Sequence, residues 1–70
     1  MTLTYKIYKI EEGIASIVST GRKTINEKEH GARYFLKKMF PRFDFSKMAN
    51  GNYVRMHDQN WEYGIAVDID

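Results

Sequence analysis

The sequence contains no cysteine, one proline and no long apolar run. The absence of cysteine excludes disulfides, thiolate chemistry and zinc sites with cysteine ligands. The five glycines are scattered at positions 13, 21, 31, 51 and 64, which excludes a glycine-rich phosphate loop. No apolar stretch approaches the roughly 20 residues that span a bilayer, and the first residues lack the pattern of a signal peptide. We therefore expect a cytoplasmic protein without a membrane partner.

Seventy residues predict a single domain spanning residues 1–70. A chain of this size buries only about 60% of the surface that its unfolded form exposes. A walled active-site cleft is difficult to build under that constraint, whereas a flat binding face is not. Aromatic residues make up 14% of the chain, with five tyrosines and one tryptophan. Tyrosine and tryptophan are enriched at binding surfaces, although tyrosine is also favoured in strands generally.

The small net charge of +2 conceals a polarity along the chain. Residues 1–12 have no net charge, residues 13–43 carry +5 and residues 44–70 carry −3. Such a distribution favours electrostatic steering toward a partner and says nothing about the fold.

Alternating apolar and polar residues predict a strand at 3–10 and a second strand at 14–20. Glu11, Glu12 and Gly13 separate the two strands and indicate a hairpin turn. Gly21 and the basic residues after it are expected to end the second strand.

Residues 26–40 predict one helix, with Asn26 as N-cap and Glu29 completing a capping box. Thr24 with Glu27 is an alternative start. Apolar residues recur at helical spacing, and Pro41 ends the helix. The apolar stripe consists of Ala32, Phe35, Leu36, Met39 and Phe40.

The last 28 residues predict two more strands, at 53–58 and 61–69. Residues 50–52 and 59–60 are turn signals, and residues 43–49 form either a loop or a short edge strand. The final strand alternates most clearly, with Trp61, Tyr63, Ile65 and Val67 on one side.

The element order β-β-α-β-β predicts an α+β fold: a four-stranded antiparallel sheet with one helix packed on one face. The helix is expected to cover Trp61, Tyr63, Ile65 and Val67. The other face of the sheet is then left for solvent or a partner.

No residue pattern indicates an enzyme, a cofactor or a metal site. His30 and His57, with Glu29 or Asp58 nearby, do not have the spacing of a metal-ligand motif. The serines lie in no nucleophile elbow or triad-like pattern, and the acids lie at turns and the chain end. We expect a non-catalytic protein without cofactor or metal.

The outer face of the predicted helix is one candidate binding surface. At helical spacing His30, Arg33, Tyr34, Lys37 and Lys38 point away from the apolar stripe. Arg22, Lys23 and Arg42 flank the helix in sequence. A solvated face is the competing interpretation, since charged outer faces are normal for amphipathic helices and Lys37 and Lys38 complement the helix dipole.

The open side of the sheet is the second candidate surface. Alternation places Lys6, Tyr8, Tyr53, Arg55 and His57 there, beside Gly64 and Ala66. Aromatic and arginine side chains on a sheet can stack unpaired bases, but the consensus of an RNA-recognition motif is absent.

Two functional hypotheses follow. The first is a small protein-binding module, of the type that phages and mobile elements encode to regulate or inhibit a larger host complex, including host defence. The second is a nucleic-acid-binding domain that uses Arg33, Lys37 and Lys38 or Tyr8, Tyr53 and Arg55. The expected binding residues are Arg33, Tyr34, Lys37, Lys38, Arg42, Tyr53 and Arg55. Exposed strand edges also make a homodimer possible.

Overall fold

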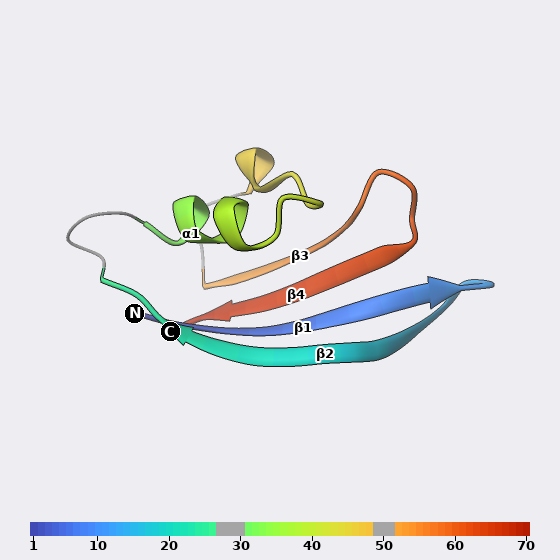
Figure 1. Ribbon diagram of the computed structural model, residues 1–70, viewed down its shortest axis with the longest axis horizontal. Coiled ribbons are helices and arrows are strands. Elements are labelled where there is room, and N and C mark those ends of the chain that lie inside the picture. Colours follow the sequence, from blue (N-terminus) through green and yellow to red (C-terminus); the bar gives the residue numbers. More distant parts are fainter. Residues whose placement is uncertain (27–30, 49–51) are drawn as a thin grey trace.

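An antiparallel sheet forms one layer of the protein, and an α-helix with a short 3-10 helix forms the other (Figure 1). The computed structural model describes residues 1–26, 31–48 and 52–70. The strands are β1 (Thr2–Glu11), β2 (Ile14–Thr24), β3 (Tyr53–His57) and β4 (Tyr63–Ile69), in the spatial order β2-β1-β4-β3. The helices are α1 (Ala32–Met39) and η1 (Phe45–Lys47). The predicted α+β fold is confirmed.

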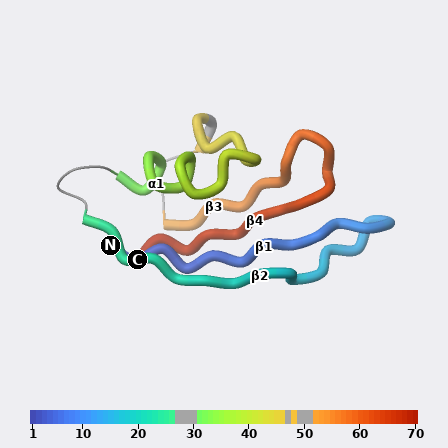
Figure 2. The backbone as a smooth tube through the Cα atoms, in the orientation of Figure 1, coloured from blue at the N-terminus to red at the C-terminus, as the bar shows by residue number. Residues whose placement is uncertain are grey.

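The β1–β2 hairpin is the longest feature of the molecule, and Figure 2 shows that its turn end extends past the helical layer. Glu12 and Gly13 form the two-residue turn, with φ angles of 51° and 78°. Two positive φ angles are what a type I′ turn requires, and this turn matches the twist of the strands it joins. β2 runs on through Gly21 to Thr24, so the expected strand end at residue 20 was wrong.

The core lies between the helical layer and one face of the sheet. Leu3 of β1, Ile65 and Val67 of β4, Leu36 of α1 and Phe45 of η1 are fully buried. The prediction that the helical layer covers Ile65 and Val67 is confirmed, and Tyr63 beside them is half-buried. Burial of each such side chain stabilises the fold by about 1.5–3 kcal/mol.

The helix begins later than the sequence predicts. Gly31 is the N-cap and Ala32 the first helical residue, whereas Asn26 is outside the helix and Phe40 is the C-cap. The capping partners Glu27 and Glu29 lie outside the described residues, as does His30. Ala32 and Leu36 are buried, as the apolar stripe predicts.

Residues 43–48, which the sequence left open between a loop and an edge strand, form a turn and η1. The Asp44 side chain accepts hydrogen bonds from the backbone N–H and the hydroxyl of Ser46, which fixes the start of η1. Phe43 and Phe45 turn into the core, with ring centroids 6.1 Å apart. In the turn signal at 50–52, Asn50 and Gly51 fall outside the described residues.

Strand β4 begins at Tyr63, so the prediction that Trp61 belongs to the strand and packs under the helix was wrong. Trp61 is in the turn between β3 and β4, has a φ of 57° and is 61% exposed. The first and last strands meet at the chain ends, where the backbones of Thr2 and Asp70 exchange two hydrogen bonds of 2.9 Å.

Candidate binding surface

The face of the sheet opposite the helical layer is called the open face here. Strand registers place side chains from all four strands on it. They are Thr4, Lys6, Tyr8 and Ile10 of β1, Ala15, Ile17, Thr20 and Arg22 of β2, Tyr53, Arg55 and His57 of β3, and Gly64, Ala66 and Asp68 of β4. The predicted neighbours Lys6, Tyr8, Tyr53, Arg55 and His57 are therefore on one face.

Large apolar side chains are exposed on this face. Ile17 is 56% exposed and Tyr53 is 55% exposed, and Trp61 extends onto the same side from the β3–β4 turn. Isolated exposed apolar residues are ordinary, whereas several on one face mark a surface that can bind a partner.

A groove of about 370 Å³ lies on the open face. Gly64, which has no side chain, lines the groove, and a Cβ at this position would lie 3.4 Å from the Met56 carbonyl and 3.9 Å from Ile10. The walls are formed by Tyr8, Ile10, Ala15, Arg55, His57 and Trp61. The groove is thus mostly apolar, with one cation at its border.

Trp61 forms one wall by stacking on His57. The two ring centroids are 3.3 Å apart, with an angle of 24° between the planes. His57 Nδ1 is 3.0 Å from the Asp58 carbonyl oxygen, which orients the imidazole. The stack holds an exposed tryptophan in one position, so less rotamer entropy is lost when a partner packs against it.

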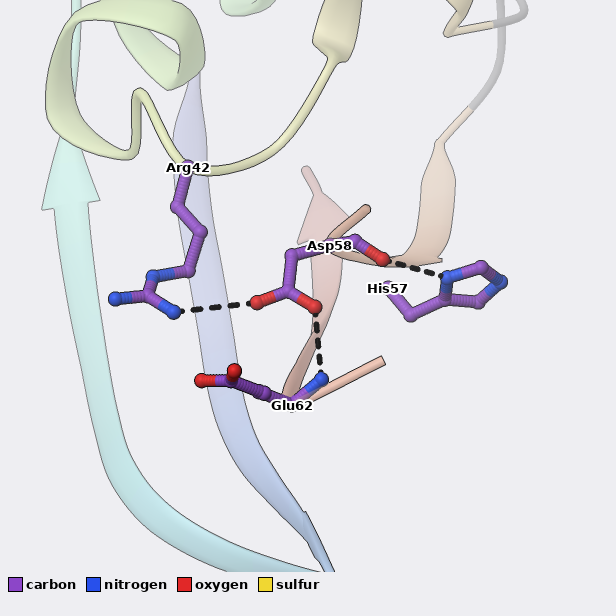
Figure 3. A network of polar contacts seen from close by, with 4 residues as sticks. All are labelled: Arg42, His57, Asp58 and Glu62. Atoms are coloured by element: carbon purple, nitrogen blue, oxygen red, sulfur yellow. Dashed lines mark hydrogen bonds and ion pairs between the residues drawn. The ribbon is translucent and has the colours of Figure 1, made fainter. Parts of the chain in front are cut away.

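The β3–β4 turn that carries Trp61 is built around the Asp58 carboxylate (Figure 3). Oδ1 accepts the backbone N–H of Glu62 at 2.9 Å, and Oδ2 pairs with Nη1 of Arg42 at 3.2 Å. The backbone N–H of Trp61 donates to the backbone carbonyl of Asp58, and this hydrogen bond closes a β-turn. Asp58 is only 5% exposed, so its charge is compensated almost entirely by these groups.

These contacts also set the ionisation of Asp58. Burial acts to raise the pKa of its carboxyl, but hydrogen bonds from the Glu62 and Tyr63 backbone and the Arg42 guanidinium outweigh it. The pKa is therefore lowered from its ordinary value, and the carboxylate stays charged at neutral pH. Asp58 acts here as the structural centre of the turn.

Arg42 follows the C-terminal end of α1 and lines a pocket of about 810 Å³ together with Lys37 of that helix. Its guanidinium lies over the Tyr63 ring, 4.5 Å from the centroid, while it pairs with Asp58. The two contacts connect the segment after α1 to the β3–β4 turn and to the first residue of β4. The structure therefore gives this expected binding residue a role in holding the turn.

The outer face of α1 carries four of the expected binding residues. Arg33, Tyr34, Lys37 and Lys38 are exposed and line a shallow depression with Gly31. Lys38 Nζ lies 6.0 Å from the Tyr34 ring centroid. Arg33 donates a 2.7 Å hydrogen bond to the Met48 carbonyl, so its guanidinium joins α1 to the segment after η1.

The sequence prediction missed the apolar residues Ile10, Ala15, Ile17 and Trp61 of the open-face surface. Ile10 follows from alternation along β1, and Ala15 follows from the two-residue turn. Ile17 depends on a bulge, because Ile7 pairs with Ser19 and Tyr8 with Ile17. No sequence signal separates Trp61 from the alternating residues after it.

Comparisons with known proteins add no relative: no family model, curated protein or solved structure matches this chain. In the part of the chain that the structure describes, no helix is long and apolar enough to cross a membrane. Across residues 1–26, 31–48 and 52–70, no three side chains of His, Cys, Asp or Glu are grouped to hold a metal ion.

Proposed function

We propose that this chain is a non-catalytic protein-binding module that acts on a larger protein as a regulator or inhibitor, and that the open face is its binding surface. The observation that carries the proposal is the groove above Gly64, with Trp61 held beside it by His57. Aromatic anchors next to a pocket are the usual centres of binding energy at protein interfaces.

The chemistry of the open face specifies what a partner should present. The register places Lys6 and Arg55 on either side of Ala66, in the row next to the groove. Neighbouring strands are separated by about 4.8 Å, so the Cα atoms of these two residues lie roughly 10 Å apart. A partner segment with an apolar side chain for the groove and a carboxylate beside it would satisfy both features.

Capture experiments with matched variants test this proposal. The tagged chain is used to recover proteins from bacterial lysates, together with Trp61→Gly, Arg55→Glu and the helix-face variant Lys37→Glu/Lys38→Glu. Trp61→Gly should leave the fold intact, since glycine suits the positive φ at this position. We expect one stoichiometric protein with the wild type and the helix-face variant, and its loss with either open-face variant.

Two results would contradict the proposal. One is the recovery of the same protein by all variants, and the other is its loss only when the helix face is altered. Thermal melts of each variant establish that loss of binding does not reflect unfolding.

Nucleic-acid binding is a second candidate, because Lys6, Arg22 and Arg55 share the open face with Tyr8 and Tyr53. The acidic Asp68 stands in the same cross-strand row as Arg22 and Tyr53, which weakens the attraction for phosphate. Fluorescence anisotropy with single- and double-stranded DNA and RNA distinguishes the candidates. Binding that weakens steeply with salt and is lost with Arg55→Glu would favour nucleic acid.

A further inference from the structure

Strand β2 leaves an unusually apolar edge at the side of the sheet. It is the terminal strand in the order β2-β1-β4-β3, and its outer backbone edge faces away from β1. Residues 14–20 contain no charged side chain, and Ile14 and Val18 are 68% and 53% exposed. An edge of this kind is a template for pairing with another strand.

The two ends of this edge carry opposite charges. Glu11 and Glu12 precede the uncharged stretch, and Arg22 and Lys23 follow it. Glu11 is already paired with Lys9 at 3.0 Å, while Glu12 stands at the tip of the hairpin. Two copies of such a strand, placed antiparallel, bring the acidic end of each beside the basic end of the other.

The bulge in β2 determines the register of such a pair. Ile14 and Ser16 face the helical side with Ser19 and Gly21, because their partners on β1 are Glu11, Lys9, Ile7 and Tyr5. The bulge thus reverses the odd–even alternation halfway along β2. Residues that pair across the dimer must point to the same face of the sheet. Even-numbered residues in the first half of β2 share a face with odd-numbered residues in the second half, so each such pair has residue numbers whose sum is odd.

Among these registers, the one in which paired residue numbers sum to 35 brings the hairpin turn that carries Glu12 beside Lys23 of the other copy. It also pairs Ile14 with Gly21, Ala15 with Thr20 and Ser16 with Ser19, each pair on one face. The bulges of the two copies meet at the twofold axis, where Ile17 lies opposite Val18. A bulge disrupts pairing with a regular strand, and here each bulge faces an identical one.

We infer that a second copy of this chain pairs with the β2 edge in this register. The product is an antiparallel dimer with one continuous eight-stranded sheet. A twofold axis perpendicular to the sheet keeps both helical layers on one side and both open faces on the other. The dimer would present two grooves on one surface, and it does not depend on the proposed function.

A charge-swap series with sedimentation equilibrium tests this inference. Wild type, Glu12→Lys, Lys23→Glu and the combined variant are compared at several concentrations, with Lys37→Glu on α1 as the matched control. By symmetry each single change turns two attractive pairs into two repulsive ones. Cross-strand charge pairs contribute about 0.2–1 kcal/mol each, so we expect the dimer dissociation constant to rise about tenfold.

The combined variant restores opposite charges and should recover the wild-type dissociation constant, while Lys37→Glu should not change it. The three substituted residues, Glu12, Lys23 and Lys37, are exposed, and circular dichroism checks that the variants fold. A wild type that stays monomeric at every concentration would overturn the inference. So would a dimer that is insensitive to the single changes, or one that the combined variant fails to restore.

Discussion

The ring of Tyr5 lies directly over Gly21 on the neighbouring strand, and the two residues are register partners in the β1–β2 ladder. A Cβ built at Gly21 would overlap the Tyr5 hydroxyl and the ring carbon that bears it. The edge of the same ring system packs against Phe40, with centroids 4.9 Å apart and an interplanar angle of 67°. Gly21 therefore gives Tyr5 the space that it needs to reach the end of α1.

Gly21→Ala is expected to destabilise the protein, because the added methyl group displaces Tyr5 from Phe40. Overpacking of this kind costs about 1–3 kcal/mol. Gly31→Ala is the matched control, since a Cβ at Gly31 meets no atom within 4 Å, and alanine as N-cap should cost less than about 1 kcal/mol. Urea denaturation of both variants measures the difference. Equal stability losses would show that Tyr5 is not held in this position.

Asp58→Asn should lower the melting temperature by several degrees at neutral pH, because it removes the ion pair with Arg42 at a buried position. The pKa of Asp58 is lowered in the folded state, so its ionisation stabilises the fold above the ordinary value of 3.8. That contribution is lost as the pH falls from 3.8 through the folded-state pKa.

Thermal melts over a pH series therefore test the role of Asp58. The difference between wild type and Asp58→Asn should be largest above pH 3.8 and should shrink below it. Asp70→Asn controls for the loss of one negative charge at the chain end. A difference that stays constant across the acid range would contradict this account.

Arg33→Met should reduce stability by about 0.5–1.5 kcal/mol, because it removes the hydrogen bond to the Met48 carbonyl. Lys37→Met on the same face is the control, and we expect it to have a smaller effect. Chemical denaturation compares the two variants. If partner binding is unchanged in both variants while only Arg33→Met is destabilised, the role of Arg33 is structural rather than in recognition.

Trp61 is the single tryptophan of the chain, so its fluorescence reports on the open face alone. It is 61% exposed, and we expect acrylamide to quench it readily in the free protein. Binding of a partner to the groove should protect it from quenching and shift its emission to shorter wavelengths. Unchanged quenching in a saturated complex would indicate that the partner binds elsewhere.

The main features of the fold could be predicted from sequence because periodicity and burial agree there. The alternation of Tyr63, Ile65 and Val67 places these residues under the helical layer. The turn at Glu12 and Gly13 requires positive φ angles, and the glycine at position 13 indicates this in the sequence.

The remaining features depend on contacts between distant residues. Gly21 lies within β2, and the Tyr5 ring on the neighbouring strand occupies the space that a side chain at this position would need. Trp61 continues the alternation of β4 in sequence, but the hydrogen bonds to Asp58 place it in the turn, and its side chain lies on the open face. The bulge that brings Ile17 to that face likewise appears only when β1 and β2 are paired.

The most direct test of the open face as the binding surface is chemical-shift mapping of the ¹⁵N-labelled chain on addition of the captured partner. We predict that the largest changes occur at Tyr8, Arg55, His57 and Trp61 around the groove, with the amides of Lys37 and Lys38 little affected. Changes concentrated on α1, with the groove residues unaltered, would contradict the account.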